Sequence, residues 1–198
     1  MTETGTALPR IDDRHRRVLL DVAARTVRDA LATGRGRLPD HRTTPNELRA
    51  PGATFVTLER ANELLGCVGT LEAVRPLVVD VASNALAAAF ADPRLPPITS
   101  DDYAHMSIKI SVLSNREPLI VGSYEAVVDA VRPGLDGLLL DAGPYRATLL
   151  PSVWPKVRDA NEFVEIVWRK AGLTPGAWPG RPYVSRYTTE EFCDPGPR

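Results

Sequence analysis

Cys67 lies between two glycines, Gly66 and Gly69, and this spacing is the strongest indication of chemistry in the sequence. A nucleophilic thiol needs open space around its sulfur and a nearby cation or helix N-terminus that stabilises the thiolate. Glycine inside a strand often marks a place where a ligand or another backbone approaches closely. The alternative is that Cys67 is a small hydrophobic residue buried in a strand. The motif therefore supplies three candidate site residues and leaves a structural role open.

Asp92 and Arg94 form a second candidate, on either side of Pro93 in a proline-rich segment that follows a predicted helix. The guanidinium of Arg94 could bind a carboxylate or phosphate group of a substrate in a two-pronged geometry. It could also stabilise a thiolate at Cys67. The alternative is that Asp92 and Arg94 pair with each other and only shape the turn.

His105 and Ser152 are weaker candidates. His105 could serve as the general base for Cys67, the minimal activated-thiol pair, or it could be a solvated histidine in front of a strand. Ser152 lacks the GxSxG pattern of serine hydrolases, so we consider it only for substrate binding.

Familiar cofactor motifs are absent from the sequence. It has no glycine-rich nucleotide loop, no HExxH and no EF-hand pattern. Its two cysteines, Cys67 and Cys193, are far apart and form no CxxC or Cys/His spacing. The sequence thus predicts no metal site and no disulfide. An enzyme of this sequence would be thiol-dependent, would need no metal or nucleotide cofactor, and would act on a small molecule.

Composition narrows the class of protein. The formal net charge is −1, whereas nucleic acid and anionic membranes normally select a basic surface. Hydrophobic residues make up 43% of the chain, which is enough for a packed core. The first ten residues lack an apolar run, and no stretch is long enough to span a bilayer. We expect a cytoplasmic protein that binds neither nucleic acid nor membrane.

Several secondary-structure elements must position the candidate residues. Hydrophobic periodicity predicts helices that begin at Asp12 or Asp13, at Pro76 and at Asn161. It also predicts strands at residues 54–58, 64–71, 108–112, 138–140 and 147–150. Residues 1–11 are expected to form a flexible arm, residues 12–192 a single domain, and residues 193–198 a tail.

The order strand, turn, strand, helix occurs twice. If the two copies are related, residues 65–68, which include Cys67, are equivalent to residues 150–153, which include Ser152. One interpretation is a duplicated ββα unit, in which Cys67, Arg94 and Ser152 would face a shared groove. The other is that two ordinary ββα units occur in one chain. Either one predicts an α+β fold.

Segments that resemble a known family occur in order along the chain. The strongest is the run from Leu64 to Gly69, which matches a six-residue LRGCIG signature. Weaker matches are residues 55–58, 84–89, 92–94, 111–114, 137–138, 149–151, 170–173 and 191–192. Together they cover roughly Asp13 to Phe192. On these residues the chain resembles the AMMECR-one domain family, whose bacterial members are called AmmeMemoRadiSam system protein A.

The resemblance implies an α+β fold with a curved, mostly antiparallel, barrel-like sheet flanked by helices. It also implies that the cysteine motif lies at a cleft. The family tends to occur with a Memo-type protein and a radical-SAM protein, which suggests a shared modification or biosynthetic pathway. Two residues depart from the family pattern. Leu65 replaces the arginine of the signature, and Leu95 replaces a phenylalanine after Asp-Pro-Arg.

Two functional hypotheses follow. In the first, Cys67 is the nucleophile or general acid/base of an enzyme that acts on a small anionic organic substrate held by Arg94. Because Leu65 carries no charge, Arg94 would have to supply the cation that the signature arginine supplies elsewhere in the family. In the second, the chain is a non-catalytic partner or scaffold for Memo-type and radical-SAM proteins, and the glycines serve packing.

Overall fold

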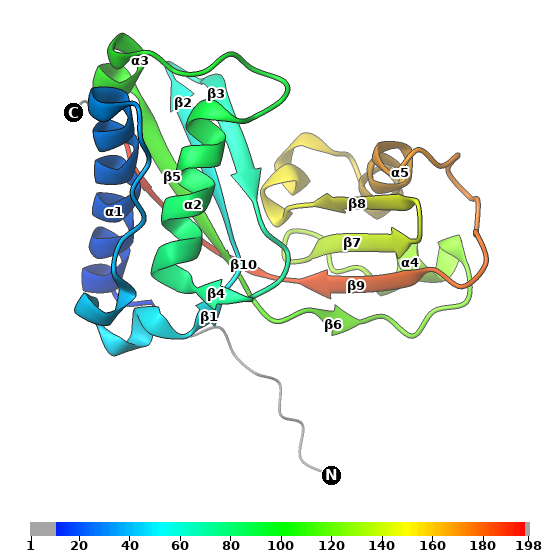
Figure 1. Cartoon of the computed structure of the whole chain (residues 1–198). Coiled ribbons are helices and arrows are strands. Elements are labelled where there is room, and N and C mark those ends of the chain that lie inside the picture. The colour runs from blue at the N-terminus through cyan, green and yellow to red at the C-terminus, as the bar shows by residue number, and fades with distance from the viewer. Residues whose placement is uncertain (1–10, 197–198) are drawn as a thin grey trace. The chain divides into compact units, whose positions relative to one another are not determined.

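The computed structural model describes residues 11–196, which form two compact units (Figure 1). The first unit comprises residues 11–113 and 190–196, and the second comprises residues 114–189. The predicted arm, apart from Ile11, and the last two residues of the predicted tail lie outside the described residues. Each unit has its own hydrophobic core, so each is described by itself.

The first unit is an antiparallel sheet covered by two long helices (Figure 1). Its strands are β1 (Pro51–Gly52), β2 (Thr54–Arg60), β3 (Glu63–Gly69), β4 (Arg75–Pro76), β5 (Ser107–Leu113) and β10 (Thr189–Asp194). Its helices are α1 (Asp13–Thr33), the short η1 (His41–Thr43) and η2 (Asn46–Arg49), α2 (Leu77–Phe90) and α3 (Ser100–His105). The main sheet has the order β10-β5-β2-β3, and β2 pairs antiparallel with both β3 and β5.

Local sequence explains where these elements begin and end. Asp12 caps α1 by accepting a hydrogen bond from the backbone N–H of His15, and Gly34 ends the helix in a left-handed conformation. Ala61 and Asn62 both have positive φ, as the two central residues of a tight hairpin require, and they join β2 to β3. The helix start at Asp12 and the hairpin around Cys67 are therefore confirmed.

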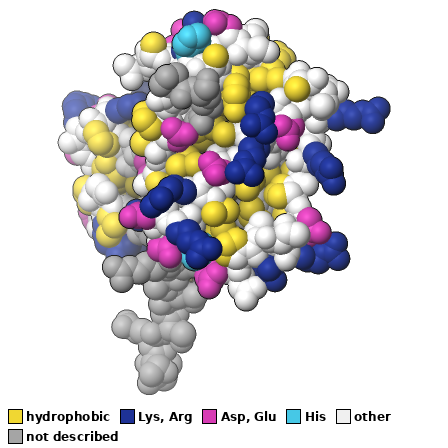
Figure 2. Space-filling model, turned by 90° about the vertical axis from the view of Figure 1, so that its left-hand side faces the viewer, with side chains coloured by type: hydrophobic (Ala, Val, Ile, Leu, Met, Phe, Trp, Pro, Cys, Tyr) yellow, Lys and Arg dark blue, Asp and Glu magenta, His cyan; other side chains and the backbone are white. Residues whose placement is uncertain are grey.

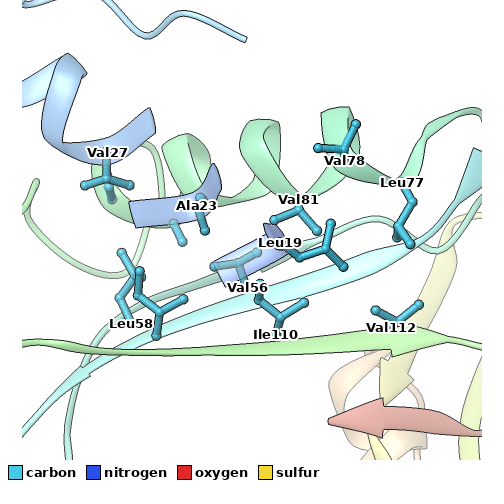
Figure 3. Packing of buried hydrophobic residues seen from close by; sticks show 14 of the residues in the cluster. Leu19, Ala23, Val27, Val56, Leu58, Leu77, Val78, Val81, Ile110 and Val112 are labelled. Carbon is cyan, nitrogen blue, oxygen red and sulfur yellow. The ribbon is translucent and has the colours of Figure 1, made fainter. Parts of the chain in front are cut away.

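The core of the first unit lies between the sheet and the two helices (Figure 3). Helix α1 contributes Leu19, Ala23 and Val27, and α2 contributes Leu77, Val78 and Val81. These face Val56, Leu58, Ile110 and Val112 of the sheet. Burying a Val, Leu or Ile side chain stabilises a fold by about 1.5–3 kcal/mol, so this layer fixes which face of each strand points inward. On the solvent side of α1, basic and acidic side chains are interspersed (Figure 2).

A buried carboxylate ties α2 to the start of β2. Asp80 on α2 is fully buried and accepts hydrogen bonds from the backbone N–H of Thr54 at 2.9 Å and from its hydroxyl at 2.7 Å. The side chains of Thr70, Arg75 and Asn84 also donate to Asp80. A buried carboxylate is tolerated only when it is paired and its lone pairs are filled, and here both conditions hold.

The second unit is a four-stranded antiparallel sheet with helices packed against it. Its strands are β6 (Glu117–Pro118), β7 (Gly137–Ala142), β8 (Tyr145–Leu149) and β9 (Tyr183–Tyr187), in the order β6-β9-β7-β8. Its helices are α4 (Tyr124–Ala130), η3 (Pro151–Lys156) and α5 (Ala160–Lys170). The stacked rings of Trp154 and Phe163, 4.0 Å apart, lie in its core.

The α+β fold with antiparallel sheets flanked by helices is confirmed, but the barrel-like closure is wrong. A barrel requires the two edge strands of a sheet to pair with each other. In the described residues the strands instead form two open four-stranded sheets, with edges at β3 and β10 and at β6 and β8, and a separate two-stranded sheet of β1 and β4. Both predicted ββα segments are present, as β2-β3-α2 and β7-β8-α5. Their origin by duplication stays a hypothesis.

Two further predictions concern membrane-spanning helices and the C-terminal tail. Within residues 11–196, no helix is long and apolar enough to cross a membrane. Strand β10 continues through Cys193 to Asp194, two residues into the segment expected to be a tail, because β10 pairs with β5 at the edge of the first sheet.

We expect Gly66 to be required for the packing of α2 on β3. A Cβ atom at Gly66 would lie 1.9 Å from the backbone oxygen of Ala88, so the helix would have to move. Gly66→Ala should lower the free energy of unfolding by about 1–3 kcal/mol, because overpacking against backbone cannot be relieved by a rotamer change. Thermal melting measures this. Gly122→Ala is the matched control because that position is open, and an equal melting temperature in the two variants would contradict the prediction.

Asp80 should contribute strongly to stability. Asp80→Ala leaves buried donors without an acceptor and should cost about 3–5 kcal/mol in urea denaturation. Asp80→Asn keeps one acceptor oxygen and should lower the free energy of unfolding by less. It is the variant to measure if Asp80→Ala does not fold. The control is Asp29→Ala, which removes an exposed pair with Arg28 and should change stability by less than about 1 kcal/mol. Equal effects of Asp80→Asn and Asp29→Ala would refute the role of the buried network.

Candidate functional site

Cys67 lies on β3, an edge strand of the first sheet, and its side chain is half-buried. Its sulfur accepts a hydrogen bond from the hydroxyl of Thr57 at 3.3 Å. Thr57 is the residue directly opposite Cys67 on β2. No motif in the sequence marks Thr57 as a site residue, because only the register of the β2-β3 hairpin brings its hydroxyl to the thiol.

The backbone of Cys67 is bound at the open edge of the sheet. Its N–H donates to Asp92 Oδ2 at 2.9 Å, and its carbonyl accepts from Arg94 Nη2 at 3.0 Å. Both groups therefore point away from β2, so Thr57 and Cys67 form a non-hydrogen-bonded pair, the kind in which opposite side chains approach most closely. Asp92 and Arg94 thus bind the backbone N–H and carbonyl of Cys67 that an additional strand would otherwise bind at this edge.

Asp92 and Arg94 also form a close ion pair. Arg94 donates from Nε to Oδ1 at 2.9 Å and from Nη2 to Oδ2 at 2.7 Å. The Asp92 side chain is 2% exposed and the Arg94 side chain 61% exposed. Hydrogen bonds from Arg94 hold the pKa of Asp92 well below its usual range. Pairing with Asp92 in turn raises the pKa of Arg94, and the Cys67 side chain adds to this shift.

The pair leaves part of the guanidinium available beside the thiol. Nη1 of Arg94 has no hydrogen-bond partner among residues 11–196, and the end of the side chain is exposed. An arginine whose other nitrogens are fixed presents its free N–H groups in a defined direction, which suits a carboxylate or phosphate. Leu65, at the position of the signature arginine, instead packs against the hydrophobic core.

The two glycines do not simply open space around the sulfur. Gly66 faces α2, on the opposite side of β3 from Cys67, and Ala88 fills that space. A Cβ atom at Gly69 would meet the ring of Phe55 at 2.3 Å, so this ring covers Gly69. Phe55 lies directly opposite Gly69 on β2, two residues from Thr57, and so on the same face of the sheet as the thiol. A role of Gly66 and Gly69 in binding a substrate stays a prediction.

The structure does not bring His105 to Cys67. His105 is exposed at the end of α3, where its Nδ1 lies 2.9 Å from the backbone oxygen of Asp101. It precedes Lys109, which shares a cross-strand row with Cys67, by four residues. At about 3.3 Å per residue along a strand, His105 lies on the order of 10 Å from that row. The geometry gives no support to His105 as the base.

Ser152 belongs to the second unit, at the start of η3, and is half-buried. Its participation in a site with Cys67 stays a prediction. Among residues 11–196 there is no cluster of three or more His, Cys, Asp or Glu side chains that could hold a metal ion.

An apolar groove of about 750 Å³ lies elsewhere in the first unit, between the end of α1, the following loop and α2. It is lined mainly by Leu31, Leu38, Leu86, Ala87 and Phe90. None of the candidate residues contributes to it. The groove is therefore separate from the thiol.

Comparison with known proteins gives one consistent result. The family model AMMECR1 matches residues 20–192. A protein of Methanothermobacter thermautotrophicus is 34% identical over 187 residues, which cover 91% of this chain and 94% of that protein. Protein PH0010 of Pyrococcus horikoshii is 34% identical over 200 residues, with 96% and 94% covered. The crystal structure of PH0010, an uncharacterised protein, superposes with a TM-score of 0.85 at 33% identity and covers 95% of both chains.

Asp92 should make stability depend on acid pH. Its folded pKa lies below its unfolded value of about 3.9, so its carboxylate stabilises the fold above that value. This contribution is lost as pH falls through the folded pKa. Asp92→Asn should therefore be less stable than the parent at pH 7, and the difference should shrink at pH 3. Urea denaturation at both pH values measures it, with Asp21→Asn, an exposed carboxylate on α1, as the control. A difference that does not change with pH would contradict this role.

Proposed function

This chain belongs to the AMMECR1 family, and we propose that it is a cysteine-dependent enzyme that acts on a small anionic organic substrate. The observation that carries the proposal is the position of Arg94 at Cys67. One guanidinium nitrogen fixes the backbone of Cys67, while Nη1 remains free beside the thiol. A thiol next to a cation and a hydroxyl donor has the surroundings that a thiolate requires.

Each residue has a distinct task in this proposal. Nη1 of Arg94 binds the anionic group of the substrate, and Asp92 holds Arg94 in place. The hydroxyl of Thr57 donates to the Cys67 sulfur and orients it. The ring of Phe55 excludes water from one side. Fixed groups of this kind hold a substrate in one orientation, which is worth several kcal/mol in bimolecular reactions.

The sulfur can act in two ways in this arrangement. As a nucleophile, the thiolate forms a bond to an electrophilic carbon of the substrate. The electron pair of the attacked double bond moves to its far atom, which takes a proton from water. As a general base, the thiolate removes a proton from a carbon or oxygen of the substrate. Either step suits a modification or biosynthetic pathway, in which Memo-type and radical-SAM proteins would supply other steps.

Alkylation of Cys67 by iodoacetamide at pH 7 tests the proposal. We use the Cys193→Ser background because Cys193 is exposed and would also react. Cys67 should react about tenfold faster than free cysteine, and Arg94→Gln should remove most of this difference, because it leaves the negative charge of Asp92 uncompensated beside the thiol. The matched control is Arg28→Gln, an exposed arginine on α1 on the other side of the sheet.

Two results together would overturn the proposal. They are a Cys67 that reacts no faster than free cysteine, and a Cys67→Ser strain whose metabolite profile matches that of the parent strain. Retention of binding to Memo-type or radical-SAM proteins by Cys67→Ser, with loss on surface substitution, would then favour the alternative of a non-catalytic partner.

A further inference from the structure

Lys109 occupies the same cross-strand row as Cys67. Strand β5 places Lys109 directly opposite Thr57, and β3 places Cys67 opposite Thr57 on its other side. Antiparallel residues that are directly opposite each other point to the same face of a sheet. The row therefore runs from Arg94 at the edge through Cys67 and Thr57 to Lys109.

The core confirms the direction of the Lys109 side chain. Its neighbours Ile108 and Ile110 are fully buried in the core cluster under α1 and α2. Side chains alternate along a strand, so Lys109 points to the face opposite the helices. The hydrogen bond from Thr57 places the Cys67 sulfur on that face too. Thiol and ammonium therefore share one surface of the first unit.

The spacing suits a small molecule. Neighbouring strands lie about 4.8 Å apart, so the Cα atoms of Cys67 and Lys109 are about 10 Å apart across two strands. The flexible four-carbon stem of lysine lets the ammonium approach the space above the sulfur. Arg94 bounds the same space from the other side of Cys67. A compact organic molecule that contacts the sulfur would then touch both cations.

The ammonium of Lys109 has no fixed counter-charge. Lys109 is half-buried, and its side chain makes no hydrogen bond or ion pair within residues 11–196. Two acids share this face. Glu59, two residues from Thr57 on β2, forms no ion pair with Lys109, and Glu191 accepts a hydrogen bond from Ser111 Oγ at 2.9 Å. The aliphatic stem of a lysine can lie on a sheet while its ammonium stays in water, so an ammonium without a fixed partner is open to a ligand. An anionic ligand would supply that partner.

We infer that Lys109 and Arg94 are two anion-binding ends of one site with Cys67 between them, and that its substrate is a small organic dianion. The inference rests on the proposed function and adds to it a second binding residue and a substrate charge. Asp92 offsets much of the charge of Arg94, whereas Lys109 has no such partner. Lys109 therefore adds a positive charge that is not tied to a carboxylate by an ion pair among the described residues.

Two alkylating agents that differ in charge test this inference. In the Cys193→Ser background, the rate ratio of anionic iodoacetate to neutral iodoacetamide reports the potential at Cys67. Lys109→Met keeps the aliphatic stem and should lower this ratio by about threefold or more, whereas Lys109→Arg should retain it. Arg28→Met is the control of equal charge change, on the opposite side of the sheet. A ratio that Lys109→Met leaves unchanged relative to Arg28→Met overturns the inference.

A second measurement does not depend on the reactivity of Cys67. The lysines of the sequence are Lys109, Lys156 and Lys170, so reductive methylation with ¹³C-formaldehyde gives few NMR signals to assign. Inorganic phosphate, a dianion, should shift the Lys109 signal more than the Lys170 signal, and Arg94→Gln should weaken this response. An unreactive Cys67 with a responsive Lys109 would refute the enzyme while keeping the anion site. A Lys109 signal that phosphate does not move refutes the anion site itself.

Discussion

The buried carboxylate of Asp80 is the contact on which the geometry of the first unit depends. It joins the first turn of α2 to Thr54 at the start of β2, and so sets where the helix lies on the sheet. The whole of α2 is 14 residues, or about 21 Å at 1.5 Å per residue, and it runs along the sheet. Its other end contacts β3 at Gly66 through Ala88. Asp92 follows directly and meets the backbone of Cys67. The hydrogen bonds of Asp80 at the start of α2 thus help to set the position of Asp92 after its end, where Asp92 binds the backbone of Cys67.

Buried aspartates also hold loops in place at two other positions of the described structure. In the second unit, Asp136 is fully buried and accepts two-pronged hydrogen bonds from Arg132 at the turn before β7. At Cys67, Asp92 is bound by Arg94 in the same way. In each case the aspartate is buried and the arginine is largely exposed. Because a buried carboxylate that loses its partner is heavily penalised, such a pair permits one loop conformation and excludes others. These pairs secure specificity of structure more than net stability.

The predictable parts of the site were those that depend on neighbours in sequence. The strand-like runs 54–58 and 64–71 on either side of a polar segment indicated the hairpin that holds Cys67, and the short separation of Asp92 and Arg94 across Pro93 indicated a pair. Thr57 and Lys109 could not be found in this way, since strand register brings them to Cys67 and periodicity does not give register. The sheet edges were missed for a related reason. Strand β10 pairs with β5 across a long stretch of chain, and a short polar segment near the C-terminus carries no signal for a partner so distant.

The charges around Cys67 give Arg94 and Lys109 different roles. Arg94 is bonded to a buried carboxylate, and two opposite charges in contact produce only a weak field beyond a few ångströms. Arg94 therefore acts at Cys67 mainly by orienting groups. It holds the backbone of Cys67 through a hydrogen bond and presents its free Nη1 to an anion. Lys109 lies on the same face and forms no ion pair among the described residues, so its charge is available to an anion. It follows that Arg94 orients an anion and Lys109 attracts it. A substrate with two anionic groups uses both residues, and a neutral substrate would use neither.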